Sequence, residues 1–489
     1  MSNRIGTTRL DANRVRLQTD SGLDIILFAN EQVPVDRASL QEVQTISEIK
    51  TLIESLNQIS FFGDYPAKLD RAVLTPDFHK GAGIPIGTVL DADGFVLPKT
   101  AGTDIGCGMR LLATTILRDD FKRCINLDNI LRHAFFEGGR NIPLDEEGRA
   151  GMLREGVIGL KPLNDGIWRH IDMTQVTNEL DHTYRFGNWP TKDLWMFDDY
   201  VKGSGGISRD SAIGSIGGGN HFCEIQYVEE CLDKQTCLDW GLRPGMVTIM
   251  VHTGSVGLGG MVGDHFVQQS RKIHPTALKM PVHAYHPLPT IGPLASHGDA
   301  YLSAMGLAAN FATVNRLMIG AVTLRCLSDA LGKTVQGRLV YDAPHNLVWT
   351  DGQRHIHRKG STPAECDCHD HVFPNGHPVI VPGSMGDASY VLKGCGSLAS
   401  LCSAPHGAGR LTARGAGRKA ATDEMEAIRV VTKIDLAKVR RDIADEYRKD
   451  LMEEAPSQYK PVLPVIDTVT DAGIASPVAR LRPLLTIKG

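Results

Sequence analysis

One cysteine, one aspartate and several histidines of this chain lie in short glycine-rich segments, and these residue types bind metal ions. Asp104 and Cys107 are three positions apart in GTDIGCGMR, where glycines let the backbone turn so that both side chains can converge. A thiolate can bridge two metal ions, while imidazole and carboxylate ligands complete coordination spheres that leave positions for phosphate or water. This segment therefore predicts one half of a metal site.

Histidines at apparent strand ends predict the other half. His252 follows the apolar run MVTIMV and precedes a Thr-Gly pair, as when a buried strand delivers a ligand to a loop. His221 and His345 each stand beside an asparagine, and His406 lies in SAPHGAGR. A lone buried histidine is more often a satisfied core residue than a ligand. Together, however, these residues favour a metal site with a nucleophilic histidine.

Regular elements must position these loops. The spacing of apolar residues predicts strand structure over residues 14–28 and a helix over residues 39–59. A buried strand is expected over residues 246–252, and a long helix from an N-cap at Asp299 to about Leu331. The other expected elements are short strands around Leu347, Ile356, Val379 and Val391, an amphipathic helix over residues 435–449, a proline-punctuated tail from Pro456, and a helical subdomain or insertion over residues 118–189 that covers one side of the site.

Composition indicates a folded protein that works in the cytoplasm. The chain has 489 residues, of which 42% are hydrophobic and 22% charged, so it can bury one large core or two closely joined ones. Ten cysteines without a recognisable secretory leader predict reduced thiols rather than a disulfide framework. Every apolar stretch is far shorter than a bilayer span, so we expect no membrane segment.

The formal charge of −4 argues against a protein that coats nucleic acid with its whole surface. Two local clusters of basic residues remain compatible with a basic groove, and a solvated surface run is the alternative for each of them. The clusters are Arg410, Arg414, Arg418 and Lys419, and Arg354, Arg358 and Lys359.

Ten short segments follow one another in a specific order along the chain. They are TPDFHKGAGIPIG, GTDIGCGMR, GGGNHFCEI, VHTGS, HNLV, HRKGSTPA, PGSMGDASYVLKG, SAPHGAGR, EEAPSQYK and the terminal Lys-Gly. In this order they resemble the RtcB family of RNA ligases, from about Asp77 to the last residue. The resemblance implies a single large α+β domain over residues 1–489, with mixed sheets around a central metal cleft and helical elaborations at its periphery.

The same resemblance implies a GTP-dependent ligation of RNA. His406 would attack the α-phosphate of GTP, expel pyrophosphate and hold GMP as a phosphoramidate. An imidazole suits this step because it is nucleophilic when neutral and a good leaving group when protonated. An RNA 3'-phosphate or 2',3'-cyclic phosphate end would then be capped with GMP and attacked by a 5'-hydroxyl end. Whether this serves tRNA splicing or RNA repair, and whether an archease-like activator takes part, stays open.

Site residues carry over from the family by position. Two manganese ions would bind Asp104, Cys107, His221, His252 and His345, with Cys107 shared between them. Asn220 and Asn346 would hold phosphate oxygens, and Arg410 and Arg414 would grip the phosphates or the RNA end. The guanine contacts would be Glu224, Ser389, Tyr459 and Lys488.

Several positions depart from the family pattern and predict a diverged paralogue with an altered substrate. Gly106 stands where many members have an asparagine, and Val256 stands where an arginine is expected. The loss of that arginine predicts a different grip on the phosphate or the RNA. HNLV and the LTAR that follows HGAGR also differ, but no proposed metal ligand or nucleophile is replaced.

Two other functions remain open at this point. The first is a binuclear metal phosphodiesterase or hydrolase, in which His406 would only contact the substrate. The second is a non-catalytic component of RNA repair that retains the scaffold. A GMP adduct on His406 would separate the ligase from both.

Some cysteines and histidines lie outside this predicted site. Cys366, Cys368, His369 and His371 fall within AECDCHDH, which is either a small zinc or iron site or, as we favour, a polar surface loop. The loop is favoured because C-x-C-H-x-H lacks the second ligand pair of a zinc finger. His79, in PDFHKG, is expected near the site without an assigned role.

Overall fold

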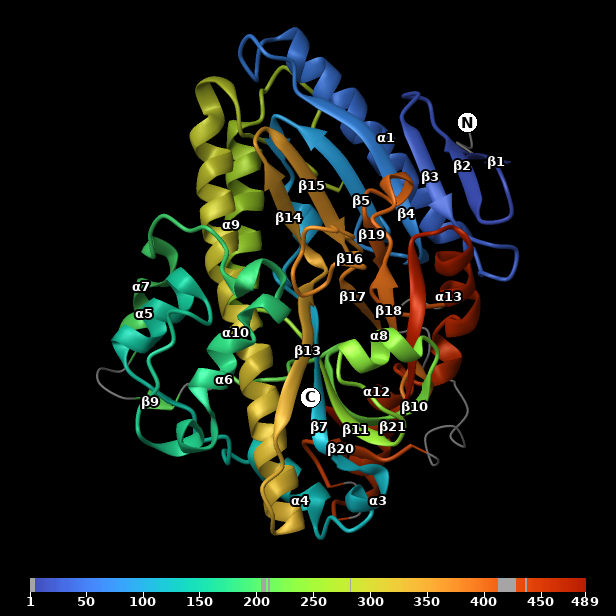
Figure 1. Ribbon diagram of the computed structural model, residues 1–489. Helices are drawn as coiled ribbons and strands as arrows, with labels where there is room; N and C mark the ends of the chain where they lie inside the picture. Colours follow the sequence, from blue (N-terminus) through green and yellow to red (C-terminus); the bar gives the residue numbers. More distant parts are fainter. Residues whose placement is uncertain (1–4, 204–207, 210–211, 282, 412–427, 436–437) are drawn as a thin grey trace.

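Two β-sheets form the framework of the computed structural model, which describes residues 5–203, 208–209, 212–281, 283–411, 428–435 and 438–489 (Figure 1). The first sheet has the strand order β1-β2-β3-β4-β5-β15-β14, and the second β13-β7-β11-β10-β21-β18-β17, with β20 paired to β21. The strands of the first sheet are β1 (Gly6–Arg9), β2 (Arg14–Gln18), β3 (Asp24–Phe28), β4 (Lys68–His79), β5 (Ile86–Asp93), β14 (Asn346–Asp351) and β15 (Arg354–Lys359). Those of the second are β7 (Gly108–Leu117), β10 (Phe222–Cys231), β11 (Met246–Thr253), β13 (Gly337–Pro344), β17 (Pro378–Val381), β18 (Ser389–Gly394), β20 (Val430–Thr432) and β21 (Ala475–Lys488).

Shorter elements connect and cover these sheets. The paired short strands are β6 (Phe95–Val96) with β12 (Leu288–Pro289), β8 (Pro143–Leu144) with β9 (Ser208–Arg209), and β16 (Ser361–Pro363) with β19 (Ser403–Pro405). The helices are α1 (Arg37–Gln58), α2 (Pro98–Ala101), α3 (Arg118–Phe121), α4 (Leu127–Phe136), α5 (Glu146–Glu155), α6 (Met173–Asn178), α7 (Asp198–Lys202), α8 (Lys234–Asp239), α9 (Gly257–Ile273), α10 (Ala295–Leu331), α12 (Arg441–Met452) and α13 (Val462–Asp471). Helices and sheets are thus mixed within one large domain, consistent with the expected α+β class.

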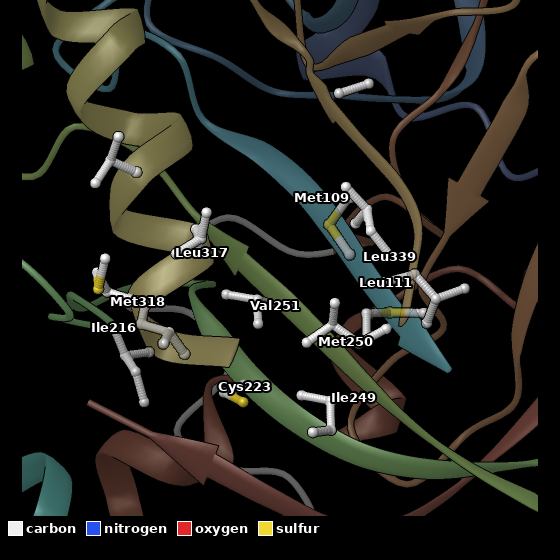
Figure 2. Close-up of a cluster of buried hydrophobic side chains, with 14 of the residues drawn as sticks. Met109, Leu111, Ile216, Cys223, Ile249, Met250, Val251, Leu317, Met318 and Leu339 are labelled. Atoms are coloured by element: carbon white, nitrogen blue, oxygen red, sulfur yellow. The ribbon is translucent and has the colours of Figure 1, made fainter. Parts of the chain in front are cut away.

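The main hydrophobic core lies between the long helix α10 and the second sheet. Figure 2 shows Leu317 and Met318 of this helix facing Val251 of β11 and Cys223 of β10. All four side chains are buried. Apolar residues surround α10 on every side, which is typical of a helix inside a protein rather than on its surface. Its position fixes the ends of β7 and β11 that carry the candidate ligands.

The central helix corrects our expectation that every apolar stretch is far shorter than a bilayer span. Among the described residues, one helical segment, Gly292–Leu331, has the length and hydropathy of a membrane span. In its most apolar window, however, 89% of the residues are buried within the protein. A core helix passes the same test of length and composition, so the segment is weak support for a membrane location.

Helix α1 covers the first sheet and begins as expected from its sequence. The side chain of Asp36 accepts hydrogen bonds from the backbone N–H groups of Ala38 and Ser39, which caps the helix. Val43, Ile46, Ile49, Ile53 and Leu56 lie on one face and are buried against the sheet. The predicted helix over residues 39–59 is therefore confirmed within two residues at either end.

Three other expectations need correction. Helix α10 begins at Ala295, so Asp299 is not its N-cap; this carboxylate instead pairs with Lys192 at 3.3 Å. The helix predicted over residues 435–449 begins only at Arg441, and residues 436–437 lie outside the described part. The tail from Pro456 contains α13 and the 14-residue strand β21, which the prolines concealed.

Residues 118–189 hold α3, α4, α5 and α6 with short 3-10 turns between them. The side chain of Asn310 on α10 holds this segment: it accepts from Trp189 N at 2.7 Å and donates to Leu153 O at 2.8 Å. None of these residues lines the central cavity. The segment therefore packs on α10 (Figure 1). We expected it to cover one side of the site, but it contributes no residue to the cavity lining. Its status as a separate subdomain or insertion stays a prediction.

Candidate active site

His345 links a strand of the second sheet directly to a strand of the first. Strand β13 of the second sheet ends at Pro344, and β14 of the first sheet begins at Asn346. The N–H of His345 donates to the carbonyl of Cys107 at 2.7 Å, which ties this junction to the loop before β7. Candidate ligands from both sheets therefore converge here.

All five predicted metal ligands come together as two triads that share Cys107. One triad is Asp104, Cys107 and His221, and the other is Cys107, His252 and His345. In each, the potential ligand atoms lie within 4.8 Å of one another. The Sγ atom of Cys107 lies 3.3 Å from Nε2 of His221 and 3.3 Å from Nε2 of His252. The thiol is thus placed between two sets of donors.

The candidate ligands can converge because the backbone at Gly254 lies close to Asp104 and Cys107. A Cβ atom on Gly254 would lie 2.2 Å from Oδ1 of Asp104 and 3.0 Å from Cα of Cys107. Only glycine fits there without displacing a candidate ligand. Gly106 has a φ of +72°, which an L-residue other than asparagine or aspartate rarely adopts.

Polar residues of α10 hold the loops of the site from behind, and our sequence analysis did not find them. Arg316 donates to the carbonyl of Gly106 at 2.7 Å and to that of Thr253 at 3.1 Å. Its guanidinium also pairs with buried Asp342 at 2.7 Å. Asn315 donates to the carbonyl of Gly254 at 3.1 Å. A signal existed, because buried polar groups in an apolar helix must find partners.

Burial sets the protonation of the candidate ligands. It lowers the pKa of His252 and His345 well below the ordinary value, and the neighbouring imidazoles add to this effect. Both rings are therefore neutral, as metal ligands must be. Burial alone would raise the pKa of Asp104, but the hydrogen bond and charge of His221 outweigh it and lower that pKa.

Cys107 differs from Asp104, because its surroundings disfavour the charged form. Burial, followed by the charge of Asp104, raises the pKa of the Cys107 thiol well above its usual value. A thiolate at this position therefore needs a cation beside it. The buried Nδ1 of His345 has no hydrogen-bond partner among the described residues. Sulfur, nitrogen and carboxylate donors grouped in two triads around one sulfur fit a pair of divalent transition-metal ions.

His406 lies beside these triads. Its ring centroid is 4.7 Å from that of His345 and 6.5 Å from that of His252. Nδ1 of His406 is 2.7 Å from Oδ2 of Asp77, whose other oxygen accepts from Thr75 Oγ1 at 2.6 Å. Asp77 therefore fixes the ring and leaves Nε2 available. Burial alone would raise the pKa of Asp77. The charge and hydrogen bond of His406, and then the hydrogen bond of Thr75, outweigh burial and lower that pKa.

His79 is near the site, as expected from its motif. Its ring stacks on that of His406 at a centroid distance of 6.4 Å, and its Nδ1 bonds to the carbonyl of Asp77 at 2.9 Å. Burial lowers the pKa of His79 to about 4, so the ring is neutral at physiological pH. The sequence had singled out this histidine but not its neighbour Asp77 in the same motif.

A cavity of about 1100 Å³ joins the triads and His406 to the remaining predicted residues. This volume exceeds that of a site for one small ligand and leaves room for a nucleotide and part of a larger substrate. The predicted residues that line it, besides those already placed, are Asn220, Glu224, Asn346, Arg410, Tyr459 and Lys488.

Glu224 lies on β10 in the wall of this cavity. Thr486 donates to Oε2 at 2.5 Å and Gln226 donates to Oε1 at 2.6 Å. Burial raises the pKa of Glu224 to about 7, and these bonds and the charge of Lys488 limit the rise. The carboxyl can therefore switch between a neutral and a charged form near neutral pH.

Arg410 and Tyr459 form one cluster at the rim. The Arg410 guanidinium pairs with Glu454 at 3.1 Å and lies 5.2 Å from the centre of the Tyr459 ring. The Tyr459 hydroxyl also bonds to Glu454. Lys488 donates to the carbonyl of His221 at 3.1 Å, so the end of β21 reaches one of the two candidate triads.

One described residue of the predicted set is not part of the cavity lining. Ser389 is buried behind Gln226, which donates to its Oγ at 2.9 Å, and it is not part of the lining. Ser384, from the same motif, does line it. Arg414 lies outside the described residues, as do Arg418 and Lys419.

The second basic cluster does not form a groove as a unit. Arg358 is buried and stacks on Trp349 at 4.3 Å, and Arg354 pairs with Asp91 at 2.8 Å. Lys359 does line the cavity, and burial lowers its pKa to about 8. Val256 also lines it and brings no charge, with a φ of +52° that is unusual for a β-branched residue.

A family model and individual relatives of this chain carry the same description. A family model described as tRNA-splicing ligase RtcB matches residues 58–489. The chain is 34% identical over 464 residues to the RNA-splicing ligase RtcB of Mycobacterium tuberculosis, covering 87% of this chain and 98% of that protein. It is 32% identical over 483 residues to the tRNA-splicing ligase RtcB of Thermococcus kodakarensis (92% and 93%), and 31% identical over 476 residues to that of Aeropyrum pernix (91% and 93%).

Proposed function

This chain belongs to the RtcB family, and we propose that it is an RNA ligase that joins a 3'-phosphate or 2',3'-cyclic phosphate end to a 5'-hydroxyl end with GTP. Family membership supports an RNA ligase with RNA as its substrate. The observation that carries the finer proposal is His406, which Asp77 orients beside two ligand triads in one cavity. A nucleophile with a fixed ring and a free Nε2 is what guanylyl transfer requires.

The proposed reaction has three transfers at phosphorus. Nε2 of His406 attacks the α-phosphorus of GTP, so a P–N bond forms and pyrophosphate leaves. An oxygen of the RNA 3'-phosphate then attacks the same phosphorus, which breaks the P–N bond and moves GMP to the RNA. A cyclic phosphate must first be opened by water. Finally, the 5'-hydroxyl oxygen attacks the RNA phosphorus, and GMP leaves as the RNA is sealed.

Asp77 acts on the first transfer by its hydrogen bond. By accepting the Nδ1 proton, it selects the tautomer with a lone pair on Nε2 and favours the positive charge that the ring gains on attack. Asp104, Cys107, His221, His252 and His345 would hold two manganese ions. When bound, these ions would neutralise phosphate charge during transfer.

Other residues of the cavity would hold GTP. The Glu224 carboxylate can accept hydrogen bonds from the N1–H and amino groups of guanine. The Tyr459 ring offers a stacking surface, and Lys488 adds positive charge near the same wall. Asn220 and Asn346 lie in the lining beside the triads, where they would donate to phosphate oxygens.

The RNA ends need positive charge, and the cavity provides it. Cations among its described lining residues are Lys80, Lys99, Arg271, Lys359, Arg410 and Lys488. Lys99 and Arg271 also line a second pocket. We propose that they contact the RNA backbone and take over the role of the arginine that Val256 replaces. We further propose that the protein works in the cytoplasm and that an archease-like protein activates it.

The test is the intact mass of the purified protein after incubation with GTP and manganese. We expect a mass increase of one GMP, which maps to the His406 peptide and is absent in His406→Ala. His133→Ala is a matched control, because this histidine is exposed on α4 and should leave the adduct intact. A phosphodiesterase or a non-catalytic RNA-repair component would form no adduct in any variant.

A second measurement addresses the RNA ends. An RNA with a 2',3'-cyclic phosphate at one end and a 5'-hydroxyl at the other should be sealed in the presence of GTP and manganese. The same RNA carrying a 5'-phosphate should not be joined. Sealing of only the 5'-phosphate substrate would refute the proposed chemistry, even if a GMP adduct forms.

A further inference from the structure

All three exposed cysteines of this chain lie on one surface patch. Cys366 and Cys368 belong to the loop between β16 and β17, and Cys395 directly follows β18. The other seven cysteines are buried or half-buried. None of these three thiols lines the cavity of the candidate active site. The patch therefore needs an explanation of its own.

Three side chains at the tip of the loop already converge. A carboxylate oxygen of Asp367, Sγ of Cys368 and a ring nitrogen of His369 lie within 4.8 Å of one another. Asp367 also accepts the backbone N–H of His369 at 2.9 Å, which folds the tip back on itself. Sulfur, nitrogen and oxygen donors within this distance are a ligand set that suits zinc.

A further thiol is available beside these three donors. Cys366 is separated from Cys368 by one residue, so the two cysteines flank Asp367. The segment that contains Cys366 is held against the end of β18, because Gly396 N donates to the carbonyl of Ala364 at 2.9 Å. A Cβ atom on Gly396 would lie 3.3 Å from Cβ of Cys366. These contacts hold the backbone of Cys366 against Gly396, two residues along the chain from Cys368, and we include its thiol as a candidate fourth ligand.

The base of the loop is held by half-buried polar side chains, two of which bond to buried tyrosines. Asp370 accepts from the N–H groups of Val372 and Phe373 at 2.8 Å each and pairs with His377 at 3.1 Å. Nδ1 of His377 lies 2.8 Å from the hydroxyl of buried Tyr341. On the other side, Glu365 accepts from the Tyr184 hydroxyl at 2.6 Å. An anchored loop loses little conformational freedom when its tip binds an ion.

We propose that residues 366–369 bind one zinc-class divalent ion through Cys366, Asp367, Cys368 and His369, at a site separate from the candidate active site. The structure thereby favours the metal-binding alternative for this segment over the plain surface loop. The site uses no residue of the proposed ligase chemistry. Its failure would leave that chemistry untouched, and the reverse also holds.

The first test measures bound zinc by elemental analysis after growth with zinc and dialysis. We expect Cys368→Ser/His369→Ala to lose one zinc per chain relative to the unchanged protein. Cys124→Ser/His133→Ala, which changes the same two residue types elsewhere, should lose none. Circular dichroism checks that each variant is folded. Equal zinc content in the loop variant and the unchanged protein would overturn the proposal.

The second test needs no variant. The full-length protein is treated with a thiol-alkylating reagent, with zinc bound or after chelation, and the modified cysteines are mapped by mass spectrometry. Cys366 and Cys368 should react slowly with zinc and rapidly after chelation. Equal reaction rates, or a disulfide between Cys366 and Cys395 in the zinc-treated protein, would contradict zinc binding at this loop.

Discussion

Oδ2 of Asp77 accepts both the ring Nδ1–H and the backbone N–H of His406, at 2.7 Å and 3.2 Å. Asp77 lies in β4 of the first sheet, and His406 follows β19, more than three hundred positions later. One buried carboxylate therefore fixes both the ring and the loop that carries it. This relationship makes Asp77 the positioning residue for the proposed nucleophile.

Replacing Asp77 by asparagine should slow guanylylation without emptying the metal site. The amide removes the negative charge and can hold the ring in the wrong tautomer, so the single-turnover rate of adduct formation should fall on the order of 10²- to 10⁴-fold. GTP affinity and metal content should stay near those of the unchanged protein. Thr75→Ser, which retains the hydroxyl that bonds to Asp77, is the control. An unchanged rate in Asp77→Asn would exclude the positioning role.

Loss of the shared sulfur should remove both ions together. In Cys107→Ser, a hydroxyl replaces the one donor common to the two triads, and hydroxyl is a much weaker ligand than thiolate. Manganese bound per chain, measured after equilibrium dialysis, should fall for both sites rather than for one. Retention of a single full-affinity manganese would show that the two triads do not share this cysteine.

Gly254 offers a test of the site's geometry without touching a ligand. In Gly254→Ala the new methyl group would lie 2.2 Å from Oδ1 of Asp104, so the carboxylate must move away from the other ligands. We expect weaker manganese binding and a lower yield of GMP adduct in a protein that remains folded. Gly257→Ala is the matched control, because a Cβ atom there meets nothing within 4 Å. Equal metal affinity in the two variants would contradict the required close approach.

The sequence singled out the candidate ligands because most of them stand in short motifs rich in glycine, but it could not predict which residues support them. Arg316 and Asn315 bond to carbonyls of the ligand loops, and both lie in a helix whose apolar pattern indicates only burial. Which loops they reach depends on packing between segments far apart in the chain. The same holds for Asp77, which becomes recognisable as a partner only when β4 and β19 are placed side by side.

Element types were predicted better than their limits. β11 and the helix after Asp36 follow clear apolar patterns, and both formed as expected. Pro477 and Pro483 hid β21, which pairs with β10 and β18 through register shifts that accommodate irregular backbone. Which of the two serines in PGSMGDASYVLKG faces the cavity depends on the fold: Ser384 lines it, and Ser389 does not.

Glu224 should make GTP binding depend on pH. Guanine donates hydrogen bonds to an ionised carboxylate, and burial raises the pKa of this group to about 7. Only the ionised fraction is competent, so GTP should bind about tenfold more tightly at pH 8 than at pH 6. Titration calorimetry would measure this. Glu224→Gln should bind GTP more weakly at pH 8 and without this pH dependence; an equally steep profile in the variant would rule out Glu224 as the titrating group.

The same group should change the stability of the ligand-free protein in the opposite direction. Because the folded pKa, about 7, is above the ordinary value of 4.5, folding favours the protonated acid. This contribution, roughly 3 kcal/mol, is fully present below pH 4.5 and is lost as the pH rises to about 7. The unfolding free energy of Glu224→Gln, measured with denaturant at pH 5 and pH 8, should lack this loss. A parallel fall in both proteins would mean that other groups cause it. If both pH effects are found, ionisation of Glu224 lowers the folding stability of the ligand-free protein. Hydrogen bonds from bound guanine to the ionised carboxylate then offset that loss.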